Sequence, residues 1–131
     1  MITEFIGIPY KDKGNSFDGA DCYGLASLFY ERNFNKSLPT YGILYASSED
    51  GPQVNDAIAT GSQDGNWKEV DEPAFGDLLF FRIKGLEAHI GVSIGGDEFI
   101  HCFPGRATCI ESLQSIQWNK RLTRVLRYAA T

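Results

Sequence analysis

Histidine, cysteine and methionine are scarce in this chain, with two, three and one of each among 131 residues. An odd number of cysteines argues against the disulfide framework of a small secreted domain, and favours free thiols in a reducing compartment. No run approaches the roughly 18 apolar residues that a membrane span needs, so we expect none. The first residues lack a basic leader followed by an apolar run, so no signal peptide is predicted.

Positive charge is also in short supply. Twelve lysines and arginines face 17 aspartates and glutamates, which gives a net charge of −5 and argues against a nucleic-acid partner. Four basic residues do gather late in the chain, and we interpret them as a solvated strand face: Lys120, Arg121, Arg124 and Arg127. The sequence has no Cys-x-x-Cys or His-x-x-x-His pair and no phosphate-binding loop, so neither a metal nor a cofactor is predicted.

What is present suffices for one domain over residues 1–131, because 43% of the residues are hydrophobic and 13% are aromatic. The pattern predicts a short helix over 1–8, ending at Gly7, and a main helix over about 20–34. Asp18 or Asp21 is the candidate N-cap of the main helix, and its stop signals are Asn33, Asn35 and Pro39. A second helix is expected over 53–59, closed by Gly61.

The second half of the chain has a different sequence pattern, in which short apolar runs are bounded by glycine. These runs predict an antiparallel meander of about five strands, at residues 76–81, 89–94, 98–103, 107–111 and 122–128. Helices that precede a run of strands, without alternating with them, indicate an α+β fold.

The chemistry centres on Cys22, which begins the main helix, and on the two histidines. A helix N-terminus and a nearby imidazole both favour the reactive thiolate, so Cys22 is the predicted nucleophile and His89 the predicted base. His101 would hold the far nitrogen of His89, as the third member of such triads does. The backbone amide of Cys22 and the hydroxyl of Tyr10 are candidate donors to an oxyanion.

Strand alternation supports this grouping. His89, Gly91 and Ser93 share one face of their strand, and Gly91 leaves room for a group to approach the sheet. If residues 95–97 form a hairpin turn, His89 and His101 can lie on the same face of neighbouring strands. Taken one at a time, each of these residues could instead be structural, and Cys102 and Cys109 are interpreted so. A zinc site with both His101 and Cys102 is disfavoured, because adjacent strand residues point to opposite faces.

Several segments together resemble the NlpC-type cell-wall endopeptidases, a family of papain-like cysteine peptidases. The matching segments are Gly7 to Tyr10, Phe17 to Leu25, Pro73 to Phe81, His89 to Gly95, and Phe99 to His101. The resemblance implies a papain-like fold, with N-terminal helices packed on the sheet. It also implies hydrolysis of amide bonds in peptidoglycan stem peptides, usually between a γ-D-glutamyl residue and a diamino acid.

The resemblance also assigns substrate-binding positions. Asp21 matches the residue that helps to bind the free amine of the substrate. Tyr23 stands where the family commonly has serine, and residues 11–14 replace the usual Trp-Gly-Gly. Both differences lie on the substrate side, where bond preference is set.

A narrower resemblance, to the peptidase domains of tailed-phage tail proteins, is carried by four features: Tyr23, the run Leu28 to Tyr30, Leu38-Pro39, and Trp118 to Tyr128. It implies a virion component, made in the host cytoplasm, that opens the wall from the periplasm or cell-wall side during genome delivery. Its partners would be other tail or hub proteins. The alternative is a structural or assembly protein of the tail hub with a latent or vestigial site.

Overall fold

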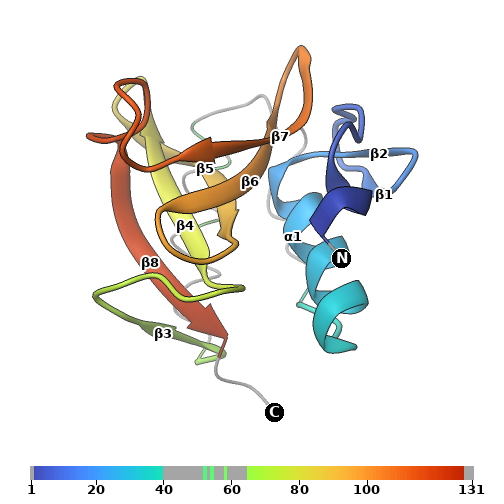
Figure 1. Ribbon diagram of the computed structural model, residues 1–131, viewed down its shortest axis with the longest axis horizontal. Helices are drawn as coiled ribbons and strands as arrows, with labels where there is room; N and C mark the ends of the chain where they lie inside the picture. Colours follow the sequence, from blue (N-terminus) through green and yellow to red (C-terminus); the bar gives the residue numbers. More distant parts are fainter. Residues whose placement is uncertain (1, 40–51, 53, 55–57, 59–64, 129–131) are drawn as a thin grey trace.

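The computed structural model describes residues 2–39, 52, 54, 58 and 65–128, and in it the helix over 22–34 lies beside a curved antiparallel sheet (Figure 1). The elements before the sheet are the 3₁₀ helix η1 (Ile2–Phe5), the two-residue strands β1 (Asn15–Ser16) and β2 (Gly19–Ala20), and α1 (Cys22–Phe34). The sheet is built from β3 (Trp67–Glu69), β4 (Leu78–Ile83), β5 (Leu86–Ser93), β6 (Glu98–Phe103), β7 (Arg106–Ser112) and β8 (Leu122–Tyr128). The α+β prediction is confirmed.

The sheet has six strands in the order β3-β8-β4-β5-β6-β7, one more than expected. The additional strand, β3, pairs antiparallel with β8, and the ring of Trp67 packs on that of Tyr128 at 4.9 Å between centroids. Three residues are too few to show the alternation that reveals a strand in a sequence. The last strand, β8, lies between β3 and β4, so residues far apart in sequence form the middle of this half of the sheet.

The main helix begins and ends where the sequence signals predict. The Asp21 carboxylate accepts a hydrogen bond from the backbone N–H of Gly24 at 2.7 Å, which makes Asp21 the N-cap. Asn35 closes the helix in the left-handed conformation with φ of 52°. In the described residues, no helix is both long and apolar enough to cross a membrane.

The other two helix predictions fare differently. The first segment forms a four-residue 3₁₀ helix, Ile2–Phe5, and not a helix over 1–8. Gly7 ends this segment with φ of 85°, as expected of glycine at a helix end. The helix predicted over 53–59 lies for the most part outside the described residues.

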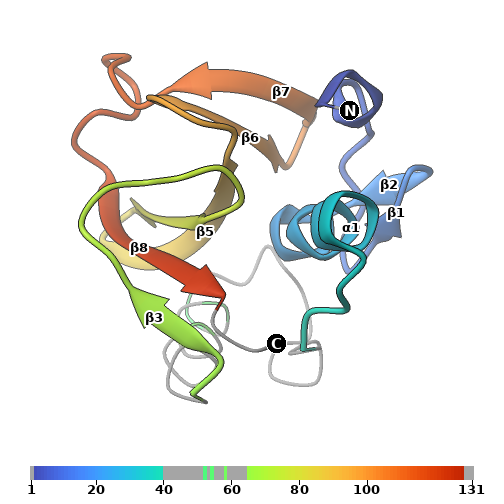
Figure 2. The ribbon, with the colours of Figure 1, turned by 60° about the horizontal axis from the view of Figure 1, so that its bottom comes forward.

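Both faces of the sheet are covered. On one face, Leu25 and Phe29 of α1 pack against Val92 and Ile100 of the sheet. On the other face, a second cluster of buried side chains surrounds Trp118, in the segment that connects β7 to β8. The view in Figure 2 looks along α1 and shows the sheet curving beside it. The strands therefore carry apolar side chains on both faces. A polar side chain that lies within either cluster is shielded from water.

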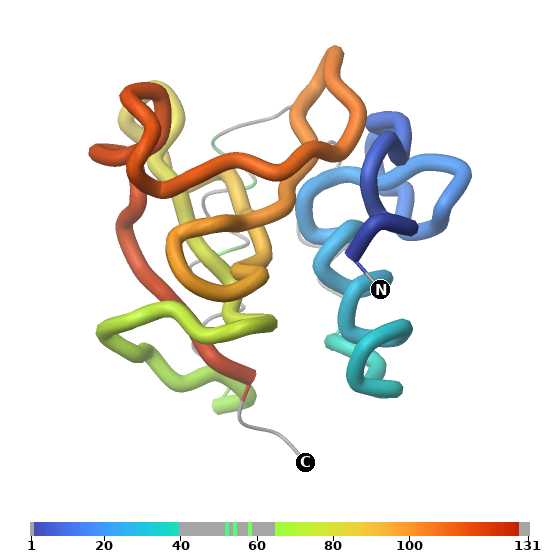
Figure 3. The backbone as a smooth tube through the Cα atoms, viewed as in Figure 1, coloured from blue at the N-terminus to red at the C-terminus, as the bar shows by residue number. Residues whose placement is uncertain are grey.

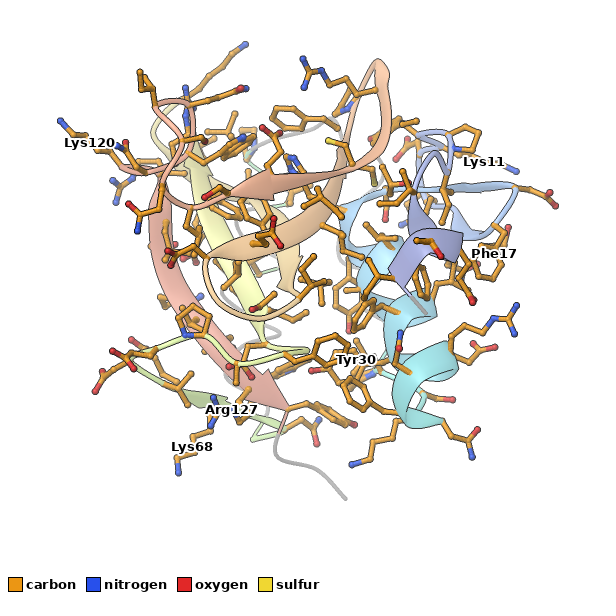
Figure 4. The ribbon with its side chains drawn as sticks, viewed as in Figure 1. Lys11, Phe17, Tyr30, Lys68, Lys120 and Arg127 are labelled. Carbon is orange, nitrogen blue, oxygen red and sulfur yellow. The ribbon has the colours of Figure 1, made fainter. Side chains whose placement is uncertain are left out.

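Hydrogen bonds hold the N-terminal segment and α1 to the sheet. Gly7 donates to the carbonyl of Thr108 at 3.0 Å, and Thr108 donates to Ile8 at 2.9 Å, which holds the first residues beside β7 (Figure 3). Tyr30 points from α1 toward the sheet and donates its hydroxyl to the carbonyl of Gly76 (Figure 4). The N-terminal segment is thus held to β7, and α1 is held through Tyr30 to the loop before β4.

Candidate active site

The structure places the sulfur of Cys22 against β5. Cys22 is the first residue of α1 and is half-buried. The backbone N–H of Ile90, the residue that follows His89, lies close enough to this sulfur to lower its pKa. Cys22 and His89 also line the same cleft. The helix start predicted to hold the nucleophile therefore meets the strand predicted to hold the base.

The two histidines meet through their rings, on neighbouring strands. Nε2 of His89 lies 2.7 Å from Nδ1 of His101, and both side chains are buried. Strands β5 and β6 pair through Val92 and Ile100, so the predicted hairpin and the shared face are confirmed. The rings of Phe81, Phe99, Phe103 and Trp118 surround the pair. The imidazoles therefore occupy a site from which water is largely excluded.

Burial controls the charge of these groups. Burial, with a smaller contribution from the negative charge of Asp21, raises the pKa of the Cys22 thiol to about 12, although nearby backbone N–H groups act to lower it. Burial, with a contribution from His101, also holds the pKa of His89 well below its usual range. Burial thus favours a neutral thiol and a neutral imidazole at rest, and it opposes the thiolate that the helix start is expected to favour.

The cleft beside Cys22 has a volume of about 510 Å³. Its described lining is mostly apolar, from Ile83, Leu86, Ala88, Phe103, Pro104 and Pro52, with Tyr10, Cys22, His89 and Cys102. Among the described lining residues, Lys84 is the one with a charged side chain, and it is exposed at the turn between β4 and β5. An apolar cleft with a nucleophile and one cation suits an extended substrate that carries a carboxylate.

The structure also places the predicted substrate-binding residues. Tyr10 lines the cleft with Cys22, and its backbone forms a bridge with Ala20. The Tyr23 hydroxyl donates to the carbonyl of Pro39 at 2.6 Å. The Asp21 side chain is 1% exposed and accepts from Gly24 and also from the N–H of Lys13 at 3.0 Å. Asp21 thus orders the start of the helix, and its role in binding a substrate amine stays a prediction.

At Gly91 the expectation of open space is wrong. A Cβ added there would lie 2.8 Å from the ring of Phe99 and 3.3 Å from that of Phe81. The missing side chain makes room for the aromatic rings of this chain that pack beside the histidines, and not for an external group.

Sequence reasoning missed Glu111 on β7. Its Oε2 lies 2.7 Å from Nε2 of His101, the nitrogen that faces away from His89. Alternation along β7 was the available signal: Cys109 pairs with His101 across the strands, and Glu111 lies two residues further on the same face. His101, Cys109 and Glu111 also form the one group in the described part of the chain whose potential metal-ligand atoms all lie within 4.8 Å of one another. That group differs from the zinc set weighed from the sequence.

The chain is similar in sequence to proteins named as peptidases. The murein DD-endopeptidase MepS/murein LD-carboxypeptidase of Escherichia coli (strain K12) is 26% identical over 128 residues, which are 97% of this chain and 59% of that protein. The γ-D-glutamyl-L-lysine dipeptidyl-peptidase of Bacillus subtilis (strain 168) is 29% identical over 127 residues, covering 94% of this chain and 37% of that protein. The chain thus spans about three fifths of the length of the E. coli relative.

Solved structures show the same fold. The NlpC/p60 domain of the peptidoglycan hydrolase SagA aligns with a TM-score of 0.61 at 24% identity, over 96% of this chain and 94% of that one. An NlpC/P60 family protein from Bacillus cereus ATCC 10987 aligns with a TM-score of 0.66 at 26% identity, over 96% of this chain and 37% of that one. The model of the NlpC/P60 family matches residues 7–127, and the chain therefore belongs to that family.

Proposed function

We propose that this domain is a cysteine endopeptidase that hydrolyses amide bonds in the stem peptides of peptidoglycan. The observation that carries the proposal is the arrangement of Cys22, His89 and His101. The thiol begins a helix that meets the strand of one imidazole, and the second imidazole bonds the first at 2.7 Å. Membership of the NlpC/P60 family, and relatives named as murein and γ-D-glutamyl peptidases, support peptidoglycan as the substrate.

The reaction follows from the neutral resting pair. As the Cys22 sulfur attacks the scissile carbonyl, its proton passes to His89, and the backbone amide of Cys22 and the hydroxyl of Tyr10 stabilise the oxyanion. His89 then gives that proton to the departing amine, which leaves a thioester on Cys22. A water molecule, deprotonated by His89, hydrolyses the thioester and regenerates the thiol. His101 keeps the ring of His89 in position throughout.

For the bond cleaved, we propose the link between a γ-D-glutamyl residue and the following diamino acid. The B. subtilis relative is named for this type of bond, whereas the E. coli relative is named as a DD-endopeptidase and LD-carboxypeptidase. The exposed cation of Lys84 beside the cleft is suited to a carboxylate of such a peptide. Asp21 and Tyr23 are the proposed contacts to the amine side of the substrate.

Mass spectrometry of the products tests both parts of this proposal. Purified stem peptides of defined sequence and purified cross-linked muropeptides are each incubated with the protein under reducing conditions, and with heat-inactivated protein as the blank. Products that end in γ-D-glutamate support the proposed bond, and products cut between two D-amino acids assign the other bond instead. Intact peptides and intact cross-linked muropeptides after incubation would contradict the peptidase assignment.

The charge state of the pair predicts how alkylation depends on pH. Because the pKa of the Cys22 thiol is raised to about 12, the thiolate fraction should grow roughly tenfold per pH unit through the neutral and mildly alkaline range. We therefore expect the rate of iodoacetamide addition at Cys22 to rise steadily from pH 7 past pH 9. Mass mapping of adducts over this range measures it. A rate that is already maximal at neutral pH would show a standing thiolate-imidazolium pair and contradict the prediction.

We further propose that the domain is a component of a phage tail, made in the host cytoplasm and acting in the periplasm or cell wall. The support comes from the sequence, chiefly Tyr23 after the nucleophile and the closing segment from Trp118 to Tyr128. Immunodetection of the chain in purified virions of the source phage or prophage, with a soluble host protein as control, tests this. Its presence only in the host fraction would contradict the tail role.

A further inference from the structure

Two buried imidazoles and a partly buried carboxylate form a line of hydrogen-bonded side chains across three neighbouring strands. Nε2 of His89 on β5 lies 2.7 Å from Nδ1 of His101 on β6, and Nε2 of His101 lies 2.7 Å from Oε2 of Glu111 on β7. The exposed fractions are 3% for His89, 2% for His101 and 19% for the Glu111 side chain. Both nitrogens of His101 are thus engaged, one toward the base and one toward an anion.

The hydrogen-bonding rules of these groups leave one arrangement for neutral rings. A carboxylate only accepts hydrogen bonds, so the nitrogen of His101 that faces Glu111 must carry the hydrogen. Nδ1 of His101 is then an acceptor, and Nε2 of His89 must donate to it. The remaining nitrogen of His89, Nδ1, has no hydrogen and can take a proton.

We propose that Glu111 is a positioning residue that fixes the tautomers of both histidines and so keeps Nδ1 of His89 ready to accept the proton of Cys22. The inference deepens the proposed function and rests on it. Glu111 acts through His101 and does not touch the substrate. A neutral imidazole has two tautomers, whereas a side-chain amide has none. Glu111 restricts His101, the third member of the triad, to one of them.

Without Glu111, His101 could adopt its other tautomer. If His101 carried its hydrogen on Nδ1, it would donate to Nε2 of His89, and the hydrogen of His89 would move to Nδ1, the nitrogen needed as base. The charge of Glu111 also affects the pKa of His101. Burial lowers the pKa of His101, while the hydrogen bond and the negative charge of Glu111 raise it, and Arg106 lowers it slightly. The same negative charge also favours the imidazolium that forms on His89 during the reaction.

The chain is well suited to a direct test, because its two histidines give a ¹⁵N spectrum with only two imidazoles. Two-bond ¹⁵N–¹H correlation spectra of the protein near neutral pH, with a chelator and a reductant present, report the tautomer of each ring. We expect both rings of the wild-type protein to carry the hydrogen on Nε2. An Nδ1–H signal from either ring would overturn the proposal, whether or not the protein cleaves any peptide.

Two variants complete the test. In Glu111→Ala we expect the tautomer of His101 to become mixed or reversed, and kcat/KM on the stem peptide to fall about 10- to 100-fold, as for loss of a charge-assisted hydrogen bond. Glu98→Gln, at an exposed glutamate on β6, is the matched control and should change neither the tautomers nor kcat/KM.

Unchanged tautomers with unchanged activity in Glu111→Ala would overturn the proposal. If that variant does not fold, the wild-type spectrum decides. An inactive wild-type protein with both rings in the expected tautomer would contradict the proposed function alone.

Discussion

Replacing Cys22 by alanine is expected to lower kcat/KM on stem peptides by at least about 10⁴-fold, the scale of loss when the nucleophile of a catalytic triad is removed. The reason is that no other described group can take over the attack. Cys102 also lines the cleft, but it is buried and its thiol is engaged as a donor to the carbonyl of Ala20 at 3.3 Å. Initial rates of product formation, followed by chromatography at several substrate concentrations, give the change in kcat/KM.

The matched control for this variant is Ser27→Ala, which removes one polar atom from another half-buried position on α1. We expect it to keep activity within about threefold, and both variants should unfold near the wild-type temperature because each loses only one side-chain atom. Equal cleavage by Cys22→Ala and the wild-type protein would show that the observed activity does not come from this site.

The largest effect on stability is expected from Phe29→Ala, at about 3–5 kcal/mol in the free energy of unfolding. The Phe29 side chain is fully buried on α1. Its ring centroid lies 5.3 Å from that of Phe5 and 5.4 Å from that of Phe75, so removal leaves a cavity between the helix, the N-terminal segment and the loop before β4. Since domains of this size are stable by roughly 5–15 kcal/mol, the change removes a large part of the total.

Urea unfolding followed by tryptophan fluorescence measures this loss. The control is Ile116→Ala, because Ile116 is 95% exposed and its truncation should change the free energy of unfolding by less than about 0.5 kcal/mol. A loss below about 1 kcal/mol in Phe29→Ala would show that this aromatic cluster does not hold α1 to the N-terminal segment and the loop before β4. Activity should fall along with stability, because α1 carries Cys22.

Local features followed well from the sequence. The start of α1 at Cys22, its cap at Asp21 and its end at Asn35 depend on hydrogen bonds within four or five residues. The shared face of His89 and His101 depends on strand alternation and a short hairpin. Strand β3 was not predicted, because three residues are too few to show the alternation of apolar and polar side chains. The position of β8 between β3 and β4 is set by pairing partners that lie 40 or more residues apart.

By itself, then, the sequence determined the class of fold, the helix that carries the thiol and the two histidines that share a face, because each depends on neighbours along the chain. Only the tertiary structure decided that the thiol lies beside the backbone of Ile90, where burial raises its pKa, and that Glu111 lies next to His101. Burial and contact distance between separate strands control both features. Neither quantity exists until α1, β5, β6 and β7 are packed together.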